Sequence, residues 1–284
     1  MDASAYAWPL MSESGFVDVE GGRIYFEAEG DGPPVLLIHG GLGTLRMWDE
    51  QVPRFAERHR VIRYDTRGFG RTETDDVEFA NRDDAIAVLD HLGVTSAAVV
   101  GQSRGAMIAL DLALDRADRV DALVSVAGGI GGYEPELADG TSQPPWDELE
   151  RLWEKKDWPA LAELETQVWV DGWGQPEDRV DPQVRSQVRE WILAGYEAGN
   201  TEGRPVPMGP PAIERLDKLD VPTLVLVGAA DEPGAVAAGR RLGEARGAQL
   251  VEFENVAHMI QLEDPDRFAE VVLEFLADAR PREA

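Results

Sequence analysis

The chain has 284 residues, 43% hydrophobic and 29% charged, which is enough to bury a substantial core and excludes a mainly disordered protein. Its 54 acidic residues outnumber the 27 basic ones and give a formal net charge of −27, which opposes binding to nucleic acid or to an anionic membrane. There are no cysteines, so disulfides and thiolate metal sites are excluded.

The first residues, Met1 to Tyr6, lack the basic patch and the apolar run of a secretory signal. No apolar stretch elsewhere approaches the roughly 18 residues that a membrane-spanning helix needs. We therefore expect a soluble, cytoplasmic protein without a membrane partner.

Eight short apolar runs, most of them bounded by Gly, Pro or Asp, predict β-strands. In chain order they are 16–19, 23–28, 35–39, 61–64, 97–100, 122–126, 223–227 and 250–253. From Val35 onward the runs are near-continuous, which is typical of strands buried on both faces of a mostly parallel sheet. Helical patterns at 82–92, 105–114 and 265–277 complete the alternation, which predicts a doubly wound α/β fold with helices covering the sheet.

Residues 130–211, called here the 130–211 region, break this alternation. They contain helical patterns at 146–156, 160–170 and 182–198 and no convincing strand, so we interpret them as a helical cap inserted into a core of residues 1–129 and 212–284. Each tryptophan in the region could simply join the cap to the core, but as a set they indicate an apolar roof over a pocket. The region contains six of the eight tryptophans, namely Trp146, Trp153, Trp158, Trp169, Trp173 and Trp191.

A possible nucleophile follows the predicted strand at 97–100. Gly101-Gln102-Ser103-Arg104-Gly105 joins this strand to the helix at 105–114, which is the setting in which G-x-S-x-G forms a nucleophile elbow. The two glycines allow strand and helix to pack closely while the serine adopts strained dihedral angles. We therefore expect the Ser103 hydroxyl to stand clear of the sheet.

A serine nucleophile needs an imidazole to take its proton and an acid to orient that imidazole. His258 lies in the loop after the strand at 250–253, at the end of the sheet where open α/β folds place their chemistry, and we expect it to be the base. Asp231 follows the strand at 223–227 in the same way and is the expected acid, with Glu232 as the alternative.

The oxyanion of an acyl-transfer reaction needs two preorganised donors. One should be the backbone N–H of Arg104 in the elbow, and the other should come from His39-Gly40-Gly41-Leu42-Gly43, with Gly41 preferred and Leu42 as the alternative. These glycines do not match a phosphate loop, because no G-K-[ST] follows and the spacing is not G-x-G-x-x-G.

Taken together, the chain from about Gly15 to Ala277 resembles the α/β-hydrolase superfamily, whose catalytic residues follow the order Ser103, Asp231, His258. It is most similar to the 3-oxoadipate enol-lactonases, non-haem perhydrolases and small carboxylesterases, and slightly less to the meta-cleavage C–C hydrolases. The resemblance rests on His39-Gly40-Gly41, on Tyr64-Asp65-Thr66-Arg67-Gly68-Phe69-Gly70-Arg71-Thr72, on the Ser103 elbow, on Pro222 to Asp231, and on Ala257-His258-Met259 with Glu263-Asp264-Pro265.

The resemblance implies an eight-stranded, mostly parallel sheet with a helical cap, and catalysis without a metal or an organic cofactor. Serine at position 103 argues against the dehalogenase and epoxide hydrolase branches, which use aspartate there. The implied activity is hydrolysis of a small carboxylic ester or lactone through an acyl-enzyme. The alternatives are a C–C bond hydrolase and a small-molecule receptor on the same fold.

Several substrate contacts are also expected. Trp146, Trp153 and Trp169 should line the pocket from the cap, and Met259 should line it beside His258. The Arg104 side chain either pairs with a substrate carboxylate or forms a salt bridge with an acidic residue of the cap or core. We expect a small ester or lactone as the substrate and no other partner. The protein should be a monomer or a homodimer of this chain.

Overall fold

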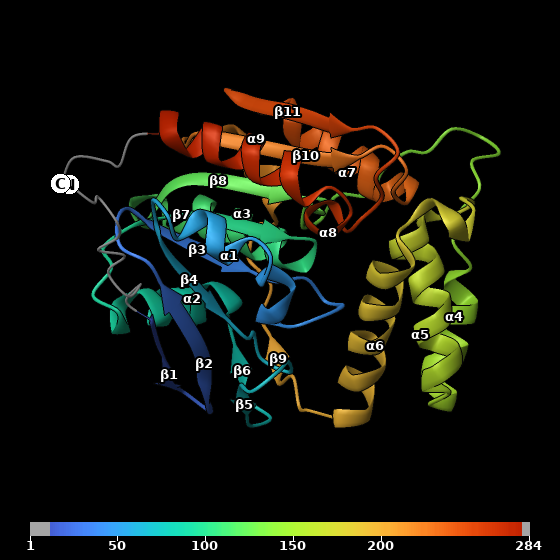
Figure 1. The fold of residues 1–284 in the computed structure, drawn as a ribbon, viewed down its shortest axis with the longest axis horizontal. Coiled ribbons are helices and arrows are strands. Elements are labelled where there is room, and N and C mark those ends of the chain that lie inside the picture. Colours follow the sequence, from blue (N-terminus) through green and yellow to red (C-terminus); the bar gives the residue numbers. More distant parts are fainter. Residues whose placement is uncertain (1–11, 280–284) are drawn as a thin grey trace, which may run out of the picture.

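A single large sheet organises the computed structural model, which describes residues 12–279; the expectation for Met1 to Tyr6 lies outside this range. Its eight main strands lie in the order β1-β2-β4-β3-β7-β8-β10-β11 (Figure 1). β1 and β2 pair antiparallel, β2 and β4 also pair antiparallel, and every pair from β4 to β11 is parallel. The strands are β1 (Ser12–Val19), β2 (Gly22–Glu29), β3 (Pro34–Ile38), β4 (Arg60–Tyr64), β7 (Ala97–Gln102), β8 (Val120–Val126), β10 (Thr223–Gly228) and β11 (Ala248–Phe253).

The predicted α/β fold with a mostly parallel sheet is confirmed. The structure adds short strands that the sequence pattern did not predict. β5 (Glu73–Thr74) pairs with β2 as a ninth strand of the large sheet. β6 (Glu78–Phe79) pairs with β9 (Arg204–Pro205), so the 130–211 region does contribute one strand, contrary to expectation. Strands of two residues are too short to give a sequence pattern.

Helices cover both faces of the sheet, because each central strand is apolar on both sides. In β3, Leu36 and Ile38 join one apolar cluster, whereas Val35 and Leu37 join the other. The first cluster lies against α2 (Asn81–His91), α3 (Arg104–Asp115) and α7 (Pro233–Gly243), and the second against α1 (Val52–Phe55), α8 (Ile260–Glu263) and α9 (Pro265–Asp278). The two-sided burial is the reason why the sequence runs are continuous instead of alternating.

Helix α7 was not predicted, because Val236 and Leu242 are its only large apolar residues and it contains three glycines. Its small residues serve close packing instead: a Cβ on Gly239 would lie only 2.4 Å from Cγ2 of Val227 in β10. The helix begins at Glu232, whose carboxylate accepts from the backbone N–H groups of Gly234 and Ala235. Such an N-cap satisfies donors that have no partner inside the helix.

The 130–211 region forms three helices beside the core, with α6 nearest to it (Figure 1). They are α4 (Trp146–Lys155), α5 (Trp158–Thr166) and α6 (Pro182–Ala198), and α5 continues into a π-helical turn over Gln167–Gly172. The two ends of the region meet, since the N–H of Ile213 donates to the carbonyl of Gly131 at 3.1 Å. Within residues 12–279, no helix is long and apolar enough to cross a membrane.

Candidate active site

The turn at Ser103 is fixed by steric contacts. Ser103 lies between β7 and α3 with φ 52° and ψ −116°, a conformation that L-residues rarely adopt. A Cβ on Gly101 would lie 2.2 Å from the carbonyl oxygen of Gly105, and one on Gly105 would lie 2.2 Å from the carbonyl oxygen of Ile38. Both positions therefore require glycine, which is the physical basis of the G-x-S-x-G pattern here.

The imidazole of His258 and the carboxylate of Asp231 are in contact. His258 Nδ1 lies 2.8 Å from Asp231 Oδ2, and both side chains are buried. The other oxygen, Oδ1, accepts from the N–H of Glu232 at 2.7 Å, which holds the carboxylate in place. Because the carboxylate accepts from Nδ1, the proton of the neutral ring is on Nδ1 and Nε2 is free to act as a base.

Glu232, the alternative acid, has a different role. Both oxygens of its carboxylate are bound to the first turn of α7, at 2.7 Å from Gly234 N and 2.8 Å from Ala235 N. The structure therefore places Asp231, and not Glu232, against His258. Within residues 12–279, no group of three or more His, Asp or Glu side chains is arranged to hold a metal ion.

Gln102, the residue before the serine, joins the loops around the site. Its Nε2 donates to the carbonyl of His258 at 3.0 Å, while its Oε1 lies so close to Gly40 that a Cβ there would be 1.9 Å away. No hydrogen bond joins the Ser103 hydroxyl to the His258 imidazole, and the turn at Ser103 is linked to the histidine loop through Gln102. In sites without substrate such catalytic contacts are often long and tighten on binding.

The two expected oxyanion donors have their N–H groups available. Arg104 is the first residue of α3, where backbone N–H groups have no acceptor inside the helix. Gly41 is exposed, and a Cβ there would meet nothing within 4 Å. Leu42, the alternative donor, follows it in the same loop.

His39 holds the loop of residues 39–43, called here the oxyanion loop because it carries the expected donor Gly41. Its Nδ1 donates to the carbonyl of Gly40 at 2.7 Å, and its Nε2 accepts from the N–H of Thr66 at 2.9 Å. Burial lowers the pKa of His39 to about 3, so the ring stays neutral at physiological pH. The neutral ring therefore ties the loop that carries Gly41 to the turn after β4.

The Arg104 side chain is paired with an acidic residue of the 130–211 region. Its Nη2 lies 2.7 Å from Glu202 Oε1, and its Nη1 donates to Thr66 Oγ1 at 2.6 Å. The guanidinium also lies 5.1 Å from the centre of the Phe69 ring. Of the two expectations for Arg104, the structure has the salt bridge.

The tryptophans expected to contact substrate lie in two places. The Trp169 ring lies 4.7 Å from the His258 ring, and Trp146 packs against Trp169 at 5.9 Å. Trp153 packs against Tyr196 at 5.5 Å and remains half-exposed, away from the imidazole.

The expectation for Met259 needs correction. Met259 is fully buried in the apolar core, and its sulfur lies 3.9 Å from Gln102 Nε2, so it supports the site from behind and is not exposed to a substrate. Its place in the chain next to His258 did not indicate that Met259 is buried in the core.

Arg179 was missed by the sequence analysis, although it connects the 130–211 region to the histidine loop. Its Nε donates to the carbonyl of Asp171 at 2.8 Å, and its Nη1 donates to the carbonyl of Asn255 and to Glu263 Oε2, each at 2.5 Å. Glu263 Oε1 in turn accepts from the N–H of Ala257 at 3.0 Å, directly before His258. A single arginine between two loops gives no sequence pattern that would indicate this contact. Its partner Glu263 does belong to the Glu263-Asp264-Pro265 motif noted in the sequence.

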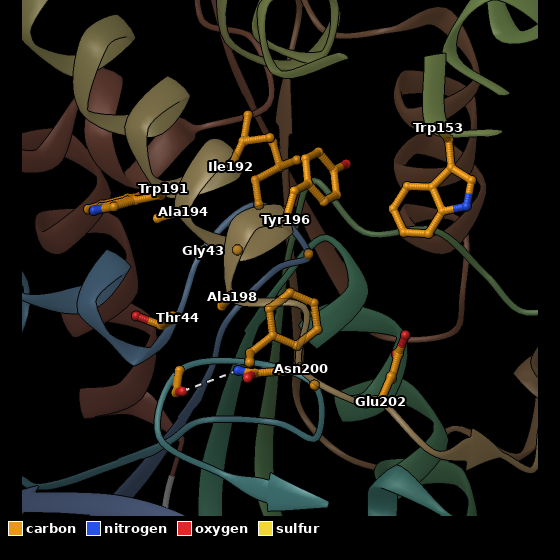
Figure 2. A pocket seen from close by; sticks show the side chains of 16 residues that line it. Gly43, Thr44, Trp153, Trp191, Ile192, Ala194, Tyr196, Ala198, Asn200 and Glu202 are labelled. Carbon is orange, nitrogen blue, oxygen red and sulfur yellow. Dashed lines mark hydrogen bonds between the residues drawn. The ribbon is translucent and has the colours of Figure 1, made fainter. Parts of the chain in front are cut away.

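A cavity of about 440 Å³ opens beside the oxyanion loop (Figure 2). It is bounded by the loop that carries Gly41 and Leu42, by the turn around Phe69, and by α6. Ser103 and His258 do not line it, whereas the two expected oxyanion-loop donors, Gly41 and Leu42, do. In the view of Figure 2, Tyr196 and Ile192 of α6 lie above Gly43 and Thr44.

Comparisons with known proteins agree with this geometry. The sequence pattern of the Alpha/beta hydrolase family matches residues 35–271. The chain is 26% identical to 3-oxoadipate enol-lactonase 2 of Acinetobacter baylyi, over 84% of this chain and 87% of the relative. It is 30% identical to the 2-hydroxymuconate semialdehyde hydrolase of a Pseudomonas species, over 90% and 91% of the two chains.

A solved structure described as Est816, an N-acyl homoserine lactone degrading enzyme, matches with a TM-score of 0.72 and 26% identity, covering 92% of this chain and 100% of that one. The family match and the two curated relatives each cover most of the chain. The chain therefore belongs to the α/β-hydrolase family.

Proposed function

We propose that this α/β-hydrolase is a serine hydrolase that cleaves a small carboxylic ester or lactone through an acyl-enzyme. The observation that carries the proposal is the 2.8 Å contact between His258 Nδ1 and Asp231 Oδ2, beside the strained elbow that presents Ser103. A base oriented by a carboxylate, together with a serine that is partly open to solvent, is the arrangement that nucleophilic acyl transfer requires.

In the first half of the reaction, Ser103 Oγ attacks the carbonyl carbon and its proton passes to His258 Nε2. The negative charge that develops on the carbonyl oxygen is stabilised by the N–H groups of Arg104 and Gly41. The bond to the leaving oxygen then breaks, His258 returns the proton to that oxygen, and the acyl group remains on Ser103.

In the second half, a water molecule gives its proton to His258 and attacks the acyl carbon. The same two N–H groups stabilise the second oxyanion, and collapse of this intermediate restores Ser103 with the proton from His258. The products are a carboxylic acid and an alcohol, which are one molecule when the substrate is a lactone. Asp231 keeps the ring oriented and stabilises its positive charge in both halves.

The 130–211 region serves in this proposal as a cap over the acyl site. Trp169 lies against His258, and Trp146 lies behind Trp169. These rings supply an apolar wall that keeps water from the imidazole except where the substrate enters.

Two relatives support ester or lactone cleavage, because their names describe an enol-lactonase and an enzyme that degrades N-acyl homoserine lactones. A C–C bond hydrolase of the meta-cleavage type is the second candidate. It is favoured by the 30% identity to a relative named 2-hydroxymuconate semialdehyde hydrolase. Such an enzyme would use the same three residues on a vinylogous diketone.

The test is steady-state hydrolysis of p-nitrophenyl esters of graded acyl length by the wild type and by Ser103→Ala. Loss of the hydroxyl should lower kcat by about 10⁴-fold or more, because the nucleophile itself is removed. Ser186→Ala, at an exposed serine of α6, is the matched control and should keep wild-type activity.

Ester turnover in Ser103→Ala at wild-type rates would refute the mechanism. Faster turnover of a vinylogous diketone than of any ester would favour the second candidate. Trapping of the acyl group on Ser103, seen as a mass increase of the intact protein, would support the first.

A further inference from the structure

The cavity beside the oxyanion loop is built for an apolar group. Its walls are aromatic rings, backbone and small side chains, and α6 turns Ala194, Gly195 and Ala198 towards it, which leaves space where larger residues would fill it. Trp153 and Tyr196 add ring surface (Figure 2). A hydrocarbon chain or ring of the substrate would be removed from water here without meeting an unpaired polar group.

The charged side chain that lines the cavity is an acid. Among the described residues that line it, Glu202 alone carries a charge. The Glu202 side chain lines the cavity and is 47% exposed, so it is accessible from the cavity side or from solvent. A second carboxylate placed there would meet a charge of the same sign.

The nearby guanidinium of Arg104 is already paired. Arg104 uses Nη2 for Glu202 and Nη1 for Thr66 Oγ1, and its guanidinium lies over the Phe69 ring, which lines the cavity. A substrate carboxylate could bind Arg104 only by displacing Glu202. The pair thus withholds the Arg104 guanidinium from an anionic substrate at this position.

We propose that Glu202 and Arg104 form a charge filter that restricts the substrate to uncharged esters or lactones with an apolar chain or ring, and that Glu202 is the residue responsible. This inference rests on the proposed function, because it concerns the substrate of the same site. It makes Glu202 a specificity-determining residue that acts against the wrong substrate, a role distinct from contacts that favour the right one.

The experiment compares two esters that differ only at the end of the acyl chain. p-Nitrophenyl valerate ends in a methyl group, and the mono-p-nitrophenyl ester of glutaric acid carries a carboxylate at the same place. We expect kcat/KM of the wild type to favour the valerate by about 100-fold, which is within the range that a mismatched polar group produces.

Glu202→Gln should reduce this preference by about tenfold or more, because it removes the repelling charge and frees Arg104 to bind the glutarate. The double variant Glu202→Gln/Arg104→Met should lose the part of that gain that comes from binding to the freed guanidinium and keep the part that comes from removing the repelling charge. Glu197→Gln is the matched control: it removes the same charge from an exposed residue of α6 that does not line the cavity, and it should leave both rates at wild-type values.

Equal kcat/KM of the wild type for the two esters would overturn the filter, as would equal changes in Glu202→Gln and Glu197→Gln, which would assign the effect to net charge. These failures differ from failure of the proposed function. If the proposed function is wrong, neither ester is turned over in a manner that depends on Ser103.

Discussion

The nucleophile elbow and the 130–211 region are held in place by different kinds of contact. At the elbow, missing Cβ atoms at Gly101 and Gly105 allow backbone to approach backbone, and no side chain can adjust if either glycine changes. The 130–211 region is held by adjustable pairs, such as Arg185 with Asp171 and Tyr196 with Glu165. A position fixed by steric contact accepts only glycine. Residues of a surface held by side-chain pairs can be substituted while the protein still folds.

The sharpest test of this comparison places the same substitution in both regions. Gly105→Ala should destabilise the protein by about 4 kcal/mol or more, because its Cβ would lie 2.2 Å from the Ile38 carbonyl oxygen. Gly195→Ala in α6, where a Cβ would meet nothing within 4 Å, should stabilise it by about 0.5–1 kcal/mol. Urea denaturation of both variants measures the difference, and effects of equal sign would contradict the comparison.

The next largest effect is expected at Arg179, which joins the 130–211 region to the loop before His258. Arg179→Met leaves Glu263 buried without its partner and should lower the free energy of unfolding by about 3 kcal/mol. It should also lower kcat by about 10–100-fold, because the loop before His258 loses its support. Denaturation and steady-state kinetics measure the two losses separately.

Arg185→Met is the control for Arg179→Met. It breaks ion pairs with Asp171 and Glu163 inside the 130–211 region and has no contact with the histidine loop. Its stability should fall, whereas its kcat should stay within about threefold of the wild type. An equal loss of kcat in both variants would mean that Arg179 acts only through the stability of the region.

A smaller, pH-dependent effect is expected at Glu165, in the middle of the 130–211 region. Burial raises the pKa of Glu165 to about 7 from an ordinary value of 4.5, although Tyr196 donates to the carboxylate at 2.6 Å. The folded state then holds a proton that the unfolded state has lost, so this residue's contribution to stability is present below about pH 4.5 and is lost as the pH rises through about 7.

Glu165→Gln should therefore match the wild type at about pH 5 and exceed its stability by about 1–3 kcal/mol at about pH 8. Tryptophan fluorescence during denaturation is a suitable probe, because six of the eight tryptophans lie in this region. Glu154→Gln, at an exposed position of α4, is the control and should show no such difference between the two pH values. A difference that is equal in both variants would contradict the assignment to Glu165.

The smallest effect is expected for an ion pair that is exposed to solvent. Arg151 and Glu148 form an ion pair on the outer surface of α4. Arg151→Ala should leave the free energy of unfolding unchanged within the error of the measurement, because water screens such pairs. A larger loss in thermal or urea denaturation would show that surface pairs hold this region more firmly than its buried ones.

The same contrast explains what the sequence could predict. Strands such as β3 and β7 were predictable because burial on both faces requires continuous apolar runs, and the elbow was predictable because its glycines are sterically required. Asp231 and His258 followed from their places after β10 and β11. Each of these signals is local in the sequence.

The missing parts depend on contacts between segments far apart in the chain. Arg179 meets Asn255 and Glu263, and Arg104 meets Glu202, which no spacing or periodicity indicates. The sequence also did not indicate that the Met259 side chain is buried in the core. Helix α7 was missed because its small residues pack closely and so carry no periodic pattern of large apolar residues.

The hydrogen bond between Ile213 and Gly131 closes the 130–211 region at its base. A segment whose entrance and exit touch can be lengthened, shortened or exchanged without pulling on the strands that flank it. The lining of the cavity can therefore change while the turn at Ser103 stays as it is. A graft between these two residues must keep Arg179, because Arg179 supports the loop before His258.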